Sequence, residues 1–287
     1  MSLRRTIASE IEARGTALHA GVAVHMVLSP GAPGAGIVFC RSDLGGVQIP
    51  ARYDAVVETN LGTVIASGAA KTRVSVGVVE HLMAAIAGAG IDDLLVTLDG
   101  PEPPILDGDA LCYLNLLTTA GIREQGTPRQ AIKVLKPVSV SHKTARASLL
   151  PAESLTYDFE IDFPAPIGRQ NYSFPFSDEG FARDIAPART FGFVQELDML
   201  KKMDRGHGAS LSNTLAIDDG RVVNAALMRF DDEFVRHKIL DAIGDMALAG
   251  LPLIGRFEGV RSGHALNNAL LKALFADGAN YTLAPLS

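Results

Sequence analysis

The order of the expected strands and helices, which occurs twice along the chain, constrains the fold more than any other feature of this sequence. In each half, short strand-like runs with glycine and proline breaks come first, and a helix, a buried strand, a turn and a second helix follow. Apolar periodicity places the helices at about 78–88 and 110–120 in the first half, and at 231–250 and 265–277 in the second. The sequence therefore predicts an α+β fold of two similar domains, each a layered sandwich of helices on a sheet.

The boundary between these domains is expected in a polar segment that contains glycine and proline. This segment, GIREQGTPRQ, covers residues 121–130 and lacks the apolar pattern of a buried element. The predicted domains are therefore residues 1–126 and 127–287. In a chain of 287 residues, each half is long enough to bury a hydrophobic core.

Charge, cysteine content and hydropathy exclude several classes of protein. The net charge is −6 and no basic run occurs, so we expect no nucleic-acid partner. Cys40 and Cys112 form neither a CxxC pair nor a disulfide framework, which is typical of a reducing compartment. No window approaches the roughly 18 apolar residues of a membrane span, and no signal peptide is evident. We therefore expect a cytoplasmic protein with no integral membrane segment.

The helix expected over 231–250 carries polar side chains where its apolar pattern predicts burial. His237, Asp241 and Asp245 are spaced i, i+4 and i+8, so they project from one face. An imidazole and two carboxylates in a core cost stability unless they are paired or bind a metal. A His/Asp pair at this spacing also occurs on helix surfaces and at helix ends, so the spacing alone leaves both interpretations open.

A metal site needs a further ligand, which the first half offers in Glu80-His81 at the start of its own helix. Zinc accepts imidazole nitrogen and carboxylate oxygen, and ferrous iron suits the same ligands. With His81, His237 and Asp241 as the three ligands, the fourth position is left for a water whose pKa zinc lowers to about 7. Glu80, beside a ligand, is then suited to take the proton of that water.

Two further residues have side chains suited to stabilising negative charge. His264 lies in a turn before the last helix, where a protonated imidazole would stabilise an oxyanion or protonate a leaving amine, with Asp245 holding its other nitrogen. The hydroxyl of Thr190, close before Gly192, would serve the same oxyanion. On pattern alone, His264 is better explained as a turn residue and Phe191 as a core residue.

Together these motifs resemble the zinc-dependent UDP-3-O-acyl-N-acetylglucosamine deacetylases, which commit Gram-negative bacteria to lipid A synthesis. The most specific motifs are RFDDEFVRHKILDAIGD at 229–245 and SGHALN at 262–267. The resemblance covers nearly the whole chain and is supported by GTALHAG, VEHLMAAIAGAGIDD, PEPPILDG and ARTFGF. It implies two β-α-α-β domains with the active site between them.

The resemblance also implies roles for individual residues. Zinc would be bound by His81, His237 and Asp241, with Glu80 as general base. The oxyanion would be stabilised by Thr190 and by a cationic His264 that Asp245 orients. The substrate is implied to be a UDP-sugar carrying an acyl chain, with no obligatory protein partner. Its contacts are expected from Lys238 to the diphosphate region and from Phe191 and Phe163 to the nucleotide.

Two inserts and several departures bear on the substrate. Residues 42–75 correspond to the insert of the first domain, and residues 194–217 to that of the second, which forms an apolar passage for the 3-O-acyl chain. The family usually has Ser-Thr shortly before Glu-His, where this chain has Val76-Gly77-Val78-Val79. It usually has Gly-Gly-Ser-Leu-Asp-Asn where 208–213 read Gly-Ala-Ser-Leu-Ser-Asn, after an unusual Gly206-His207.

These departures motivate a second hypothesis, a paralogue that deacetylates a different nucleotide-activated or acylated amino sugar. A third hypothesis is a nucleotide-sugar or lipid binding protein with a structural metal. Three protein ligands beside a glutamate argue against the third, because structural zinc sites are usually closed by four protein ligands.

Overall fold

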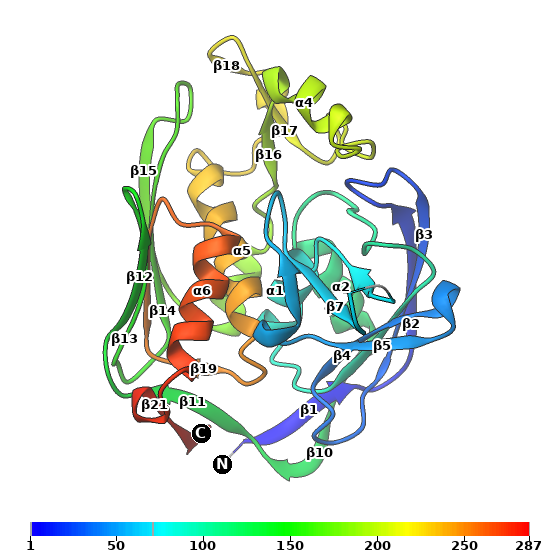
Figure 1. Ribbon diagram of the computed structural model, residues 1–287, viewed down its shortest axis with the longest axis vertical. Coiled ribbons are helices and arrows are strands. Elements are labelled where there is room, and N and C mark those ends of the chain that lie inside the picture. The colour runs from blue at the N-terminus through cyan, green and yellow to red at the C-terminus, as the bar shows by residue number, and fades with distance from the viewer. Residues whose placement is uncertain (1, 71, 287) are drawn as a thin grey trace.

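The computed structural model describes residues 2–70 and 72–286 as an α+β fold built on two five-stranded sheets (Figure 1), so the predicted fold class is confirmed. The strands of the first sheet are β2 (Ile11–Thr16), β3 (Ala23–Pro30), β4 (Ile37–Arg41), β5 (Val47–Pro50) and β9 (Leu94–Leu98). Those of the second are β12 (Val138–His142), β13 (Ala145–Leu150), β14 (Thr156–Asp162), β15 (Arg169–Pro175) and β20 (Arg256–Val260).

The two sheets repeat one topology. Their strand orders are β2-β3-β9-β4-β5 and β12-β13-β20-β14-β15. The central strand β9 pairs antiparallel with β3 and parallel with β4. In the same way, β20 pairs antiparallel with β13 and parallel with β14. The inward faces alternate as expected of half-buried strands, with Tyr157, Phe159 and Ile161 of β14 buried. The internal repeat inferred from the sequence is therefore confirmed.

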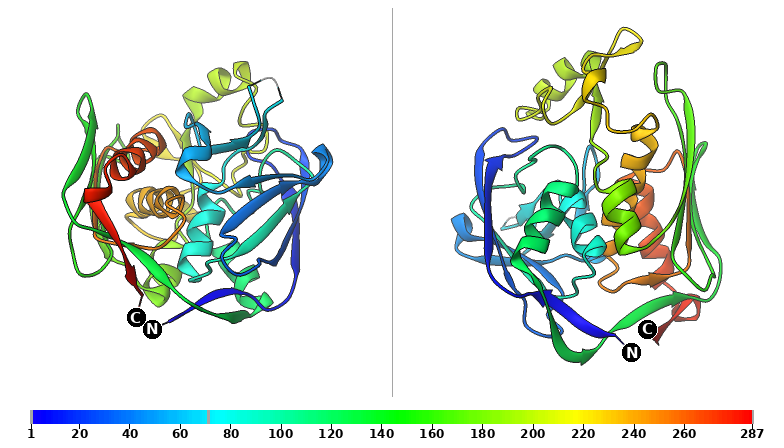
Figure 2. Two further views of the ribbon diagram at one scale, coloured as in Figure 1. Left: turned by 60° about the horizontal axis from the view of Figure 1, so that its bottom comes forward. Right: turned by 180° about the vertical axis from the view of Figure 1, so that it is seen from behind.

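The longest helices of the described residues lie between the sheets, which form the outer layers (Figure 2). They are α1 (Glu80–Gly88), α2 (Leu111–Ala120), α5 (Glu233–Ala247) and α6 (His264–Phe275). Helices α1 and α5 lie side by side at the centre, and Leu82 and Ile243 belong to one continuous hydrophobic core. The core therefore extends across both halves of the chain.

The segment between the halves, where the domain boundary is expected, contains a strand. Within residues 121–130, β10 (Ile122–Pro128) pairs antiparallel with β1 (Leu3–Ile7). Its side chains are mostly exposed, so it has no apolar alternation, and its backbone partner comes from a distant part of the chain. The expected boundary at 126–127 falls inside this strand, and the division into domains 1–126 and 127–287 stays a prediction.

Short elements connect and cover the two sheets. Strand β11 (Gln130–Val134) pairs with β19 (Leu253–Ile254) and β21 (Tyr281–Pro285). Single turns of 3₁₀ helix occur at Ser42–Leu44, Tyr53–Ala55, Val194–Glu196, Ala225–Leu227 and Gly278–Asn280. Helix α3 (Asp178–Gly180) is continued by a π-helical turn at Phe181–Ile185.

The two expected inserts contain small sheets of their own. In residues 42–75, of which Lys71 lies outside the described residues, β6 (Val56–Glu58) and β7 (Val64–Ser67) pair in a sheet with β8 (Val74–Val76). In 194–217, α4 (Leu197–Lys202) precedes β17 (Leu215–Asp218), which pairs with β16 (Phe191–Phe193) and β18 (Arg221–Val222). This second group projects beyond the sheets at the top of Figure 1.

None of the helices in the described part of the chain combines the length and the apolar composition needed to cross a membrane.

Candidate active site

The three predicted metal ligands lie together between α1 and α5. His81 is at the start of α1, and His237 and Asp241 are one turn apart on α5. Asp241 Oδ1 is 3.6 Å from His81 Nε2 and 3.4 Å from His237 Nε2. A tetrahedral zinc with bonds of about 2.0–2.2 Å has ligand atoms roughly 3.3–3.6 Å apart, so these positions fit one ion. All three side chains are buried, which excludes the surface interpretation of the His/Asp pair.

The protonation of His237 suits a metal ligand. Its Nδ1 lies 3.1 Å from the carbonyl oxygen of Ala188, so this nitrogen donates and Nε2 keeps its lone pair toward Asp241. Burial lowers the pKa of His237 to about 3, so the ring is neutral at physiological pH. Helix α5 thus presents an uncharged imidazole and a carboxylate on the same face.

Lys238 contacts the metal-ligand cluster directly. Its ammonium lies 2.5 Å from Asp241 Oδ2 and is largely buried. Burial opposes ionisation of Asp241, but the neighbouring charge of Lys238 outweighs it and holds the pKa of Asp241 well below its usual range. Asp241 is therefore a carboxylate with one oxygen paired to Lys238 and the other facing both histidines.

Glu80 precedes His81 and faces the same space. Its Oε2 accepts a hydrogen bond from the backbone N–H of Thr63 at 2.9 Å, and its Oε1 lies 3.8 Å from His264 Nε2. Burial raises the pKa of Glu80 above the ordinary value of a glutamate. A carboxylate with a raised pKa is a stronger base, as proton transfer from water near neutral pH requires.

His264 and Asp245 form a hydrogen-bonded pair on the other side of Glu80. Asp245 Oδ2 lies 2.9 Å from His264 Nδ1 and accepts a second hydrogen bond from Asn267 at 2.8 Å. Burial opposes the charged imidazole, but the carboxylates of Asp245 and Glu80 outweigh it and raise the pKa of His264 to about 9. His264 is therefore a cation at neutral pH, as its proposed role requires.

A buried ion pair fixes the segment that carries Thr190. Glu233, fully buried at the start of α5, accepts hydrogen bonds from the backbone N–H of Arg189 at 3.0 Å and from its Nε at 3.1 Å. Its other oxygen accepts from the backbone N–H of Arg229 at 2.5 Å. The carboxylate at the positive end of α5 thus places Thr190 and Phe191 beside His237.

A cavity of about 510 Å³ contains the predicted site. Every predicted residue except Asp245 lines it, and Asp245 lies behind His264. Phe163 and Phe191 meet edge to face with ring centres 5.5 Å apart, and Phe191 lies 6.2 Å from the ring of His237. Much of the remaining wall is apolar and comes from residues 191–216, including Phe193, Leu197, Leu200 and Leu211.

The structure also places residues in the site that the sequence did not single out. His19 lines the cavity, and its Nε2 lies 2.8 Å from the carbonyl oxygen of Leu61. Thr63 and Asn267 both contact Asp245. His19 and Asn267 lie inside motifs used for the resemblance, but no spacing links them or Thr63 to α5, since their proximity depends on the fold.

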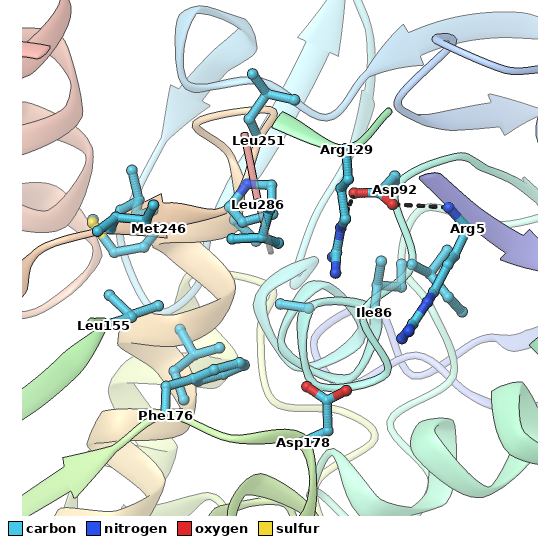
Figure 3. A pocket seen from close by; sticks show the side chains of 18 of the residues that line it. Arg5, Ile86, Asp92, Arg129, Leu155, Phe176, Asp178, Met246, Leu251 and Leu286 are labelled. Atoms are coloured by element: carbon cyan, nitrogen blue, oxygen red, sulfur yellow. Dashed lines mark hydrogen bonds and ion pairs between the residues drawn. The ribbon is translucent and has the colours of Figure 1, made fainter. Parts of the chain in front are cut away.

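Two other features lack the chemistry of this site. A second cavity, also about 510 Å³, lies between the C-terminal ends of α1 and α5 (Figure 3), and none of the predicted residues lines it. Its polar groups include Arg129, which pairs with Asp92 at 2.8 Å. A second group of possible metal ligands consists of Asp107, Asp109 and Cys112. Both of its carboxylates pair with Arg229, and burial raises the pKa of the Cys112 thiol to about 12.

Comparisons with known proteins agree with the motifs. Residues 4–276 match the model of a family described as LpxC: UDP-3-O-acyl N-acetylglycosamine deacetylase. A UDP-3-O-acyl-N-acetylglucosamine deacetylase of Myxococcus xanthus (strain DK1622) is 44% identical over 284 residues, which are 98% of this chain and 89% of that protein. A protein of the same name from Nautilia profundicola is 46% identical over 277 residues, 96% of this chain and 93% of that protein. Another, from Aliarcobacter butzleri (strain RM4018), is 43% identical and covers 99% and 93% of the two chains.

Proposed function

Since the chain belongs to the UDP-3-O-acyl-N-acetylglucosamine deacetylase family, we propose that it removes the N-acetyl group from UDP-3-O-acyl-N-acetylglucosamine and releases acetate. In a Gram-negative bacterium this is the committed step of lipid A biosynthesis. The observation that carries the proposal is the buried cluster of His81, His237 and Asp241, with Glu80 beside it, in the wall of a largely apolar cavity.

The metal we propose is zinc, held by His81, His237 and Asp241, and ferrous iron suits the same donors. When bound, it would supply a Lewis acid for the acetamide carbonyl and a water of lowered pKa. The donor set supports this, because one carboxylate oxygen and two imidazole nitrogens face one another at distances that suit a single ion. Three protein donors would leave such a metal able to bind a water as well.

The protein's own groups would then carry the proton transfers. Glu80 takes a proton from the water while the water oxygen attacks the carbonyl carbon of the acetamide. The Thr190 hydroxyl and the His264 imidazolium donate hydrogen bonds to the resulting oxyanion. As the C–N bond breaks, the leaving nitrogen receives a proton from His264, whose charge Asp245 stabilises, and acetate and the free amine are the products.

The cavity supports an acylated nucleotide sugar as the substrate. The Lys238 ammonium is suited to the diphosphate, and the faces of Phe191 and Phe163 to the uridine. The apolar wall from residues 194–217 supports an acyl passage. We further propose that the two domains both contribute to the site, with Glu80 and His81 from residues 1–126 and His237, Asp241 and His264 from 127–287.

We place the protein in the cytoplasm. Cys40 and Cys112 are both free thiols in the structure. A reducing compartment keeps such thiols free, which supports this location.

The unusual segment around His207 favours a second candidate, a deacetylase of a different nucleotide-activated or acylated amino sugar. The backbone N–H of His207 donates to the carbonyl oxygen of His19 at 3.2 Å, and that of Gly208 donates to Leu18 at 3.0 Å. Because His19 and Leu18 line the cavity, this departure lies against its wall. Its effect would be on substrate preference and not on hydrolysis.

Replacement of Glu80 tests the proposed mechanism. We expect Glu80→Gln to retain stoichiometric zinc while acetate release falls by about 10²–10⁴-fold, because the amide cannot accept the proton. Glu160→Gln is the control, since Glu160 pairs with Arg169 on the surface and should leave turnover unchanged. Turnover of Glu80→Gln close to that of the unaltered protein, with zinc bound, would exclude Glu80 as the base.

A further inference from the structure

Thr63 connects the expected first-domain insert to both helices that carry the site. It lies between β6 and β7, and only 1% of its surface is exposed. Its backbone N–H donates a hydrogen bond to Glu80 Oε2 at 2.9 Å, and its hydroxyl donates one to Asp245 Oδ1 at 2.6 Å. One residue therefore contacts both the proposed base and the carboxylate that holds His264.

The hydroxyl of Thr63 completes the surroundings of Asp245. The Oδ2 atom of Asp245 is already bonded to His264 at 2.9 Å and to Asn267 at 2.8 Å. Within residues 2–70 and 72–286, the hydrogen bond to Oδ1 comes from Thr63. Because Asp245 is 2% exposed, its orientation depends on these partners, and loss of the hydroxyl would let the carboxylate turn and take His264 with it.

The loop around Thr63 is fixed independently of its hydroxyl. The carbonyl oxygen of Thr63 accepts a hydrogen bond from the backbone N–H of Val79 at 3.3 Å. Gly62, with φ of +147°, allows the loop to approach the helix closely, since a Cβ there would lie 3.1 Å from Glu80 Oε1. Backbone contacts thus already hold this loop on α1, so the hydroxyl is not needed for that purpose.

We propose that Thr63 is a positioning residue whose hydroxyl orients Asp245 and, through it, the imidazole of His264, while its backbone amide orients Glu80. The proposal rests on the proposed deacetylase function, because it assigns Thr63 a task within that reaction. Thr63 donates hydrogen bonds to two side chains, and both are carboxylates of the site. Thr63, from outside α1 and α5, thus links the proposed base to the carboxylate that holds the cationic histidine.

Two substitutions separate the hydroxyl from the rest of the residue. Thr63→Val keeps the branched shape and the backbone amide but lacks the hydroxyl, whereas Thr63→Ser keeps the hydroxyl. We expect the kcat of Thr63→Val to fall roughly 10- to 100-fold, with KM and bound zinc within about twofold of the unaltered protein. Thr63→Ser should stay within about threefold of the unaltered kcat.

Two further measurements distinguish positioning from a general loss of stability. Thr6→Val is the matched control, because Thr6 is also fully buried and its hydroxyl accepts a hydrogen bond from Gly31 at 3.0 Å, outside the site. Its kcat should equal that of the unaltered protein. In a His264→Ala background, Thr63→Val should cause no further loss of kcat, because the hydroxyl acts through His264.

The outcomes separate this proposal from the function on which it rests. If the unaltered protein releases no acetate in the same assay, the proposed function is wrong. If the unaltered protein is active and Thr63→Val has the same kcat, the role of Thr63 is overturned. The role is also overturned if Thr63→Val lowers kcat by the same factor in the His264→Ala background as in the unaltered protein. Should Thr63→Val not fold, Thr63→Ala also removes the hydroxyl and keeps the backbone amide, and an unchanged kcat in that variant would equally overturn the role.

Discussion

Asp245 shows how one buried carboxylate sets the charge of a neighbouring histidine. Burial alone would keep His264 neutral, as it does His237, whose pKa falls to about 3. Asp245 at 2.9 Å, together with Glu80 at 3.8 Å, reverses this effect and raises the pKa of His264 to about 9. Two histidines in one cavity thus differ in charge, His237 being neutral and His264 cationic, as the proposed roles of metal ligand and proton donor require.

Replacement of Asp245 by Asn should therefore change the pH dependence of the reaction. In the proposed mechanism His264 acts as the cation, so kcat/KM of the unaltered protein should fall as the pH rises through about 9. Asn removes the largest contribution that raises this pKa, so the alkaline fall should move to lower pH. A pH–rate profile of both proteins, with the surface variant Asp158→Asn as control, measures this. An alkaline limb at the same pH in Asp245→Asn would contradict the assignment.

Helices α1 and α5 approach closely enough for their relative position to set the site. A Cβ on Gly244 would lie 2.0 Å from the carbonyl oxygen of Glu80 and 2.7 Å from its carbonyl carbon. The backbone of α5 is thus in contact with the first residue of α1. Because His81 is on α1 and the other two predicted metal ligands are on α5, this contact fixes the distances between their side-chain atoms.

Gly244→Ala should therefore reduce both stability and metal binding. Alanine in a helix interior normally stabilises relative to glycine by up to about 1 kcal/mol. Here the methyl group would push α1 and α5 apart, so we expect a loss of about 1–3 kcal/mol in unfolding free energy and weaker zinc binding. Denaturant unfolding and metal titration measure both, with Gly278→Ala, whose Cβ would meet no atom within 4 Å, as control. An increase in stability with unchanged zinc affinity would contradict the close packing.

Elements with a buried apolar face could be predicted from the sequence, whereas exposed elements could not. Helix α5 was predicted because its apolar stripe is buried and its polar residues share one face, and it extends from Glu233 to Ala247. Strand β10 was not predicted, since its exposed residues carry no alternation and its partner β1 is more than a hundred residues away. Thr63 was not predicted either, because its contact with Asp245 joins positions 182 residues apart.

At the scale of the whole molecule, the site depends on both copies of the repeated topology. Equivalent helices of the two halves, α1 and α5, meet between the outer sheets and bring the predicted ligands together. The segments outside the repeat then shape the cavity: residues 194–217 contribute much of its apolar wall, and Leu61 of the other insert also lines it. The helices of the repeat thus carry the predicted metal ligands, and we expect the inserts to set substrate preference.

The most direct test compares the rate of acetate release from UDP-3-O-acyl-N-acetylglucosamine with the rate from UDP-N-acetylglucosamine. The rate of the Glu80→Gln variant defines the background. Burial of roughly four methylene groups of the acyl chain, at about 0.8 kcal/mol each, predicts a kcat/KM at least about 100-fold higher for the acylated substrate. A preference for the unacylated sugar would indicate the alternative deacetylase, and acetate release at the background rate from both would contradict the proposed function.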